Sequence, residues 1–201
     1  GSISQTVCTI IPEFFSKEDL KNAVDACLQL SRKGNCPDGS HGPISRWDVS
    51  SVTDMNRLFA DANYFNDDIS KWDVSSVSDM SGLLIRAMAF NGDISKWDMS
   101  SVTSMLAMFL GDRWFNSDIS KWDVSNVKGM AGMFTWAESF NSDLSKWDVS
   151  SVTDMAFMFD KTTSFNGDIS KWDVSRVTNM YGMFFNTLFF NGDLSKWDVS
   201  S

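Results

Sequence analysis

The sequence predicts an α/β repeat solenoid of 25-residue coils, each with one short parallel strand and one short helical segment, behind an N-terminal helical cap. Tryptophan recurs every 25 residues without an insertion or deletion, and a fixed period of roughly 20 to 50 residues is typical of solenoids. Within each unit, strand-like alternation gives way to helix-like spacing. Residues 3–41 lie outside the repeat. The recurring tryptophans are Trp47, Trp72, Trp97, Trp122, Trp147, Trp172 and Trp197.

One unit shows how a coil is assembled. Its Lys-Trp-Asp-Val string alternates polar and apolar residues with the period of a strand. Val177, Met180, Met183 and Phe184 then follow at spacings of three, three and one, which fit one face of a short helix. Ser175 stands where an N-cap is expected. No single coil can bury its apolar side alone, so stability depends on stacking against neighbouring coils.

Stacking like upon like generates columns. The tryptophans are expected inside, as core, with a bend between Ile69 and Trp72 because simple alternation cannot place both on one face. The flanking residues form exposed acidic and basic columns, and the basic charges should offset repulsion between carboxylates. The acidic column is Asp48, Asp73, Asp98, Asp123, Asp148, Asp173 and Asp198, and the basic column is Arg46, Lys71, Lys96, Lys121, Lys146, Lys171 and Lys196.

Two further columns belong to turns. An asparagine recurs from Asn66 to Asn191 and is expected to satisfy backbone groups in an amide ladder. A second acidic column lies two residues before a serine, which suits an Asx turn. The same column is the weak alternative for a calcium site, because calcium takes oxygen ligands. Its central members are Asp93, Asp118 and Asp143.

Composition limits the function classes. A net charge of -9 argues against nucleic acid, whose phosphates are bound by Lys and Arg. No apolar run reaches the roughly 18 residues of a membrane span. A single histidine, His41, is expected to be a loop residue, and no nucleophile–base set or phosphate loop appears. We therefore expect a monomer that is not an enzyme, has no cofactor and requires no metal.

Residues 3–41 are predicted to cap the first coil, with a helix at about residues 16–31. All three cysteines lie here: Cys8, Cys27 and Cys36. A Cys27–Cys36 disulfide would tie the helix end to the next loop and would suit a secreted protein, and Cys8–Cys36 is the alternative. Residues 1–2 are typical of a cloning remnant. The repeat occupies residues 42–201 as six to seven coils and is expected to be truncated at its C-terminus.

The recurring string Phe-Asn-x-Asp-Ile-Ser-x-Trp-Asp-Val-Ser-Ser-Val-x-x-Met-x-x-Met-Phe resembles the BspA-like leucine-rich-repeat surface proteins. Their mycoplasma-lipoprotein-type, DUF285-like repeats have the same 25-residue period. The resemblance covers residues 42–201. It implies a leucine-rich-repeat-like right-handed arc, an extracellular or cell-surface location, and adhesion or protein binding without catalysis.

The positions that vary between units are the candidate recognition sites, because a repeat fixes its scaffold and leaves the connections free. Large aromatic and arginine side chains gather there, and these types dominate binding hot spots. The candidates are Arg113, Trp114, Trp136, Tyr181 and Phe185, with Leu188 and Phe189 beside them. The opposite face offers Lys96, Lys121, Lys146, Asp98, Asp123 and Asp148.

Three functions follow as expectations. The first is a non-catalytic binding or adhesion module that recognises a protein or polysaccharide. The second is a structural spacer of an envelope or matrix. The third is a calcium- or mineral-associated protein that uses the Asp columns. Exposed aromatic side chains at the variable positions would favour binding, whereas buried ones would favour a spacer.

Overall fold

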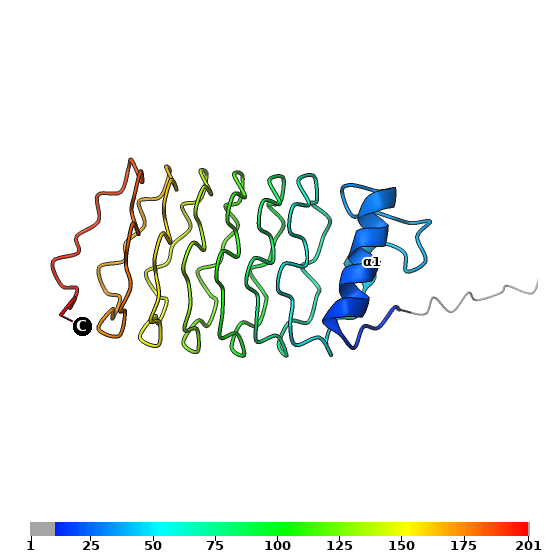
Figure 1. Cartoon of the computed structure of the whole chain (residues 1–201), viewed down its shortest axis with the longest axis horizontal. Coiled ribbons are helices and arrows are strands. Elements are labelled where there is room, and N and C mark those ends of the chain that lie inside the picture. The colour runs from blue at the N-terminus through cyan, green and yellow to red at the C-terminus, as the bar shows by residue number, and fades with distance from the viewer. Residues whose placement is uncertain (1–10, 201) are drawn as a thin grey trace, which may run out of the picture.

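The computed structural model describes residues 11–200, and successive repeats lie side by side along its long axis with the helical cap at one end (Figure 1). Each repeat is named here by its recurring tryptophan and runs from seven residues before it to seventeen after it. Backbone and ring contacts recur at the 25-residue period throughout. The chain is thus a repeat structure, largely irregular in secondary structure, held by an aromatic ladder.

Within residues 11–200 the only helices are α1 (Lys17–Leu30) and a single 3-10 turn, η1 (Ile44–Arg46), and no strand occurs. Neighbouring repeats are joined instead by isolated parallel bridges, such as Asp79↔Ser104. The expectation of one strand and one helical segment per coil is therefore wrong. The helix-like spacing does mark a buried face, but the backbone of that segment is not helical.

The segment expected to be helical is a run of tight turns, here called the turn ribbon: residues 55–62, 80–87, 105–112, 130–137, 155–162 and 180–187. In the ribbons up to residue 162, every second N–H donates to a carbonyl of the next repeat at 2.7–3.0 Å, as Met105 does to Gly129 and Phe109 to Met133. An α-helix would direct those N–H groups to its own carbonyls four residues earlier. The ribbon instead uses them to bind its neighbour.

Two positions of each ribbon have positive φ, which a helix does not contain. They lie ten and fourteen residues after the recurring tryptophan, and eight of the twelve are not glycine. In the Trp147 repeat they are Phe157 (φ 55°) and Lys161 (φ 56°). A residue with positive φ at the third place of a turn is characteristic of type II turns. This geometry aims alternate N–H groups along the stacking direction.

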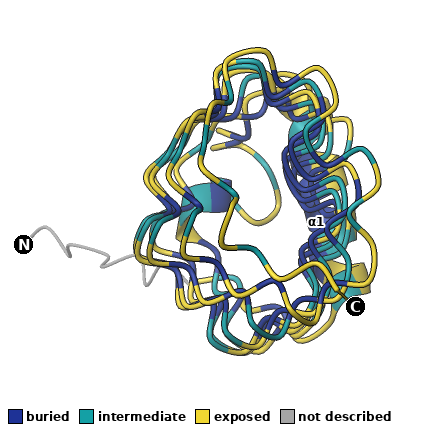
Figure 2. Cartoon of the chain, turned by 90° about the vertical axis from the view of Figure 1, so that its left-hand side faces the viewer, coloured by how far each residue is buried: buried dark blue, intermediate teal, exposed yellow. Residues whose placement is uncertain are grey.

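The core is built from columns of identical or similar side chains. The tryptophans from Trp47 to Trp172 are each 4% exposed, as predicted for core residues. Neighbouring rings lie nearly parallel, with centroids 6.5 Å apart for Trp147 and Trp172. Buried Phe, Ile, Val and Met columns complete the interior. The view along the stack shows buried positions recurring from one repeat to the next (Figure 2). The predicted bend is a turn in which Trp72 N–H donates to the Ile69 carbonyl at 3.1 Å, and both side chains are buried.

Both predicted turn columns are confirmed. Each asparagine carboxamide accepts from the next asparagine of the column, as Asn91 Oδ1 does from Asn116 N–H at 2.9 Å. Each aspartate of the second acidic column accepts from the serine two residues on, as Asp118 does from Ser120 N–H at 3.0 Å. The outer acidic column makes the same turn, with Asp98 accepting from Ser100 N–H.

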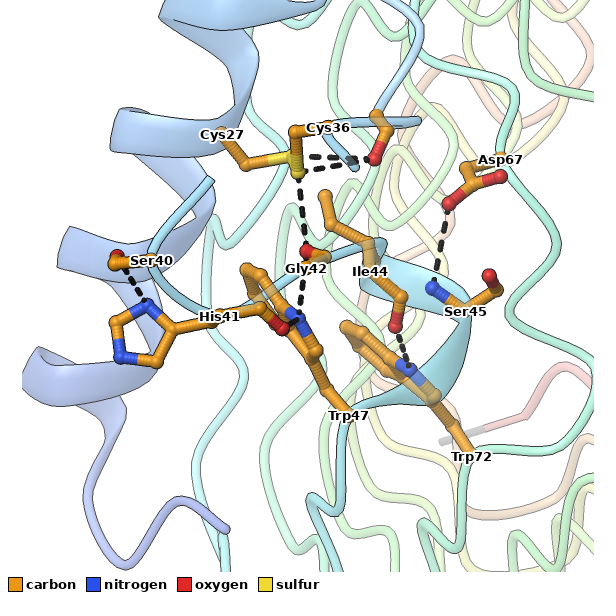
Figure 3. The surroundings of a disulfide bond; sticks show 11 residues. Cys27, Cys36, Ser40, His41, Gly42, Ile44, Ser45, Trp47, Asp67 and Trp72 are labelled. Carbon is orange, nitrogen blue, oxygen red and sulfur yellow. Dashed lines mark hydrogen bonds between the residues drawn. A yellow bond between two sulfur atoms is a disulfide. The ribbon is translucent and has the colours of Figure 1, made fainter. Parts of the chain in front are cut away.

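The cap begins with Ser16, whose hydroxyl accepts from Asp19 N–H at 3.1 Å and so starts α1 at Lys17. Helix α1 lies within the predicted range of about 16–31 and buries Leu20, Ala23 and Val24 against the core. The pair Cys27–Cys36 forms a disulfide (Figure 3). Cys8 lies outside the described residues, as do residues 1–2 and 201.

The loop after α1 takes the place of a preceding repeat. Trp72 and each recurring tryptophan after it donates its indole N–H to the carbonyl 28 residues earlier, as Trp97 does to Ile69 at 3.1 Å. Trp47 donates instead to the carbonyls of His41 and Gly42, at 3.0 and 3.2 Å (Figure 3). The Sγ of Cys36 also contacts the Gly42 carbonyl. The disulfide therefore braces the segment that completes the first repeat.

Candidate functional site

The turn ribbons present one face of the molecule on which the repeats differ, and we call this face, with the two variable positions that follow each ribbon, the variable face. Its residues lie 9, 10, 13, 14, 16 and 17 positions after each recurring tryptophan, and most of them are at least partly exposed, although Thr135, Ala156 and Asp160 are buried. The residues 8, 11 and 12 positions after each recurring tryptophan are Met, Leu or Phe, and they are buried in the ribbons up to residue 162. Side chains on this face are positioned by backbone bonds between repeats, so these residues can change without altering the scaffold.

The predicted recognition residues are exposed on this face. Trp114 is 66% exposed, Trp136 45%, Tyr181 74% and Phe185 60%. Arg113 is exposed as well, and so are Leu188 and Phe189. The contrast with the recurring tryptophans, at 4%, separates the two sets cleanly. The variable aromatic side chains therefore do not fill the space between repeats.

Contacts between neighbouring repeats order part of this face. The Arg113 guanidinium binds the Glu138 carboxylate at 2.8 Å, and Arg113 O accepts from Ser139 N–H. The Lys161 ammonium lies 3.8 Å from the centroid of the Trp136 ring. Such cation–π contacts contribute about 0.5–1 kcal/mol at exposed sites. Arg113 and Trp136 each contact the residue 25 positions later, in the next repeat: Arg113 contacts Glu138, and Trp136 contacts Lys161.

One repeat further along the stack, Phe157 packs edge-on against Tyr181 of the following ribbon, with ring centroids 5.1 Å apart. Phe157 also covers Gly182, where a Cβ would lie 2.6 Å from the ring. Sequence reasoning did not select Glu138, Phe157 or Lys161. Comparing side chains at the same position of neighbouring repeats would have found them, because these contacts join residues 24 or 25 apart.

The basic column and the outer acidic column are exposed, but their side chains do not form ion pairs with one another. Lys96, Lys121 and Lys146 are exposed, as are Asp98, Asp123 and Asp148. Among residues 11–200 the ion pairs are Lys17–Asp54, Lys21–Asp25, Arg86–Asp61 and Arg113–Glu138, and none joins the two columns. The carboxylates bind serines instead. The Ser100 hydroxyl and amide lower the pKa of Asp98, and Ser125 lowers that of Asp123 in the same way.

The weak metal alternative is not supported by the arrangement of its oxygens. Asp93, Asp118 and Asp143 are exposed, and each accepts from its own serine. Hydrogen bonds from Ser95 and Ser120 lower the pKa of Asp93 and Asp118. In the described part of the chain, no group of three His, Cys, Asp or Glu side chains is placed to hold a metal ion. No helix there is long and apolar enough to cross a membrane.

A hollow of about 670 Å³ lies away from the variable face, where the cap meets the first repeat. Pro12, Pro37 and His41 contribute to its wall. The His41 ring lies 5.5 Å from that of Phe14, and its Nδ1 is 2.9 Å from the Ser40 hydroxyl. His41 is an exposed turn residue, as expected.

The recurring apolar residues of this chain are buried in columns, and most of the residues that vary between repeats are exposed on one face. The chain is therefore a repeat protein whose recurring apolar residues form the scaffold. Two overlapping segments, residues 34–135 and 108–201, match the family described as Mycoplasma protein of unknown function, DUF285. The chain belongs to this family, which confirms the DUF285-like part of the resemblance. No curated protein matches it.

Proposed function

We propose that the chain is a non-catalytic binding module of a secreted or cell-surface protein, and that it recognises a protein or glycan through its variable face. The observation that carries the proposal is the exposure of Trp114 and Trp136, which lie in repeats with a neighbour on both sides, at positions where the repeats differ. Large exposed aromatic side chains rarely gather on one face without a binding role. A spacer would have no need of them.

The proposal includes an architecture. The repeats form a leucine-rich-repeat-like right-handed solenoid arc that is rigid along the stack. The four N–H···O bonds between neighbouring ribbons, as from Arg86 to Leu110 at 2.7 Å, support this view. Pre-ordered side chains lose less entropy on binding. The Arg113–Glu138 and Lys161–Trp136 contacts would hold the central part of the variable face in this way.

The location is part of the same proposal. The Cys27–Cys36 disulfide supports an oxidising, extracellular or cell-surface environment, because disulfides persist there and are rare in reducing compartments. The chain works as a monomer, without a cofactor, and does not bind nucleic acid. The charged columns form the second candidate surface of the same module.

Affinity capture tests this proposal. The intact chain, a Trp114→Ala/Trp136→Ala variant and a Lys96→Gln/Lys121→Gln/Lys146→Gln variant are immobilised and exposed to cell-surface protein and polysaccharide extracts, with and without calcium. Loss of capture in the Trp variant alone is expected. Loss in the Lys variant alone would move recognition to the charged columns. No capture by the intact chain would refute binding and favour the spacer.

A further inference from the structure

One carboxyl group is buried within a column that is otherwise apolar or hydroxylic. The column lies fifteen residues after each recurring tryptophan and ends each turn ribbon. Asp112 occupies it in the Trp97 repeat, is 0% exposed, and has no hydrogen-bond partner at either carboxyl oxygen. Its column neighbours are Ala87 and Ala137. Neither can bind a carboxylate, so an ionised Asp112 would be unsatisfied.

Other members of the column show what a polar group does there. The Thr162 hydroxyl donates to the Phe134 carbonyl at 2.7 Å, and the Thr187 hydroxyl donates to the Phe159 carbonyl at 2.6 Å. Each acceptor lies 28 residues earlier in the chain. For Asp112 the equivalent acceptor is the Leu84 carbonyl, which accepts the Ala87 N–H at 2.9 Å and keeps a second lone pair. A donor at the Asp112 position could use that lone pair, whereas an acceptor there would have no partner.

Only a protonated carboxyl group can donate. We infer that Asp112 is a neutral carboxylic acid in the folded chain, that its O–H donates to the Leu84 carbonyl, and that ionisation of this acid releases the turn ribbon at residues 105–112. The closed state of this ribbon thus depends on Asp112 keeping its proton. The Thr162 and Thr187 ribbons are fastened by hydroxyls that do not titrate in this range.

The charged groups around Asp112 do not offset the burial. Arg86 on the preceding ribbon is bound to Asp61, and Arg113 on its own repeat is bound to Glu138 of the following one. All four are at least partly exposed, whereas the Asp112 carboxyl points into the core. Burial alone raises the pKa of Asp112 to about 9. This direction agrees with the geometry, which offers the Asp112 carboxyl an acceptor and no donor.

The sign of the pH effect follows. An open ribbon exposes Asp112 to water, where its pKa is near the ordinary 3.8. Between that value and about 9, opening releases one proton. The open population therefore rises up to about tenfold for each unit of pH. The ribbon at residues 105–112 is closed in acid, and its open population grows through neutral pH towards alkaline pH.

The position of Asp112 in the chain links its ionisation to the variable face. Asp112 directly precedes Arg113 and Trp114, and Gly111 N–H binds the Thr135 carbonyl of the next repeat at 2.7 Å. Loosening the ribbon would disorder the centre of the variable face. That consequence for recognition rests on the proposed function, whereas the protonation of Asp112 does not.

Amide hydrogen exchange from pH 5 to 8, corrected for intrinsic rates, tests the inference on the intact chain and on Asp112→Asn and Asp112→Thr. Both variants keep a donor and cannot ionise. In the intact chain, protection of the Gly111 and Phe115 amides should fall by up to about tenfold per pH unit. It should stay level in both variants. The equivalent amides of Asp61 and Phe65 should stay level in all three proteins, because Ala62 takes the place of Asp112 in their repeat and the Arg86 hydrogen bond lowers the pKa of Asp61.

Equal slopes in the intact chain and Asp112→Asn would overturn the inference. A slope shared by the Asp61 and Phe65 amides would overturn it as well, since their repeat has Ala62 in place of Asp112. The measurement needs no ligand, so a failed capture experiment leaves its outcome unaffected.

Discussion

The indole N–H of Trp122 donates to the backbone carbonyl of Ile94 at 3.0 Å, 28 residues earlier and one repeat away. The same bond recurs from Trp72 to Trp197. The side chain of one repeat thereby satisfies the backbone of another, inside the core. Phenylalanine would fill most of the same space but could not make this bond.

Trp122→Phe should lower the free energy of unfolding by about 2–4 kcal/mol, because a buried hydrogen bond is lost and a cavity is left. Guanidinium denaturation measures the change. Trp114→Phe is the matched control: its side chain is 66% exposed, and its effect should be within about 0.5 kcal/mol of zero. Equal losses in the two variants would contradict the assignment of core and surface.

Ala107 has φ 53°, a conformation that glycine adopts without strain. Ala107→Gly should therefore raise the free energy of unfolding by about 0.5–1 kcal/mol, the relief of strain exceeding the entropy cost of glycine. Ala131→Gly is the control at a ribbon position without positive φ, and it should be destabilising. Thermal unfolding of both variants gives the comparison. Destabilisation by both would exclude the alternating-turn backbone.

The disulfide supports the loop that accepts from Trp47. Its two cysteines are nine residues apart, and closing such a loop stabilises a chain by about 2–3 kcal/mol. Cys27→Ser/Cys36→Ser, in a Cys8→Ser background, should lose that amount relative to Cys8→Ser alone. Hydrogen exchange should quicken in α1 and around Trp47 and remain unchanged in the Trp147 repeat. Unchanged protection of α1 would show that the disulfide does not brace the cap.

The exposed Asp–Ser turns predict a loss of stability in acid. Serine hydrogen bonds lower the pKa of Asp98 and Asp123 below the ordinary 3.8. Their contribution is complete above about pH 4 and is lost as pH falls through the lowered pKa. The Tm should therefore fall below about pH 4. Ser100→Ala/Ser125→Ala should fall less steeply over the same interval, and an equally steep fall would exclude these turns as its cause.

Much of the scaffold could be predicted because identical units reveal their own columns. The tryptophan core, the asparagine ladder, the Asx turns and the cap helix follow from spacing and residue type, whereas Cys27–Cys36 was one of two pairings that the sequence left open. The backbone of the turn ribbon did not. Val177, Met180 and Met183 fit one face of a helix, but they fit alternating turns equally well. Positive φ at Phe157 or Lys161 leaves no signature in residues that rarely adopt it.

The variable face was predictable only as a set of positions. Exposure of Trp114 and Trp136 could not be derived from the sequence, because a large side chain can fill space between repeats or face solvent. The pairing of Lys161 with Trp136 requires the register between repeats. Asp112 could have been found in the sequence by comparing it with Ala87, Ala137 and Thr162 in the same column.

The division between a recurring scaffold and a free variable face is tested most directly by one measurement of Tm. Trp114→Ser/Trp136→Ser removes two large side chains from the face, and Trp97→Phe/Trp122→Phe removes only two indole N–H groups and some volume from the core. The first variant should melt within a few degrees of the intact chain, and the second should melt far lower. A large loss of Tm in the first variant would show that these tryptophans hold the repeats together, which would contradict a face reserved for recognition.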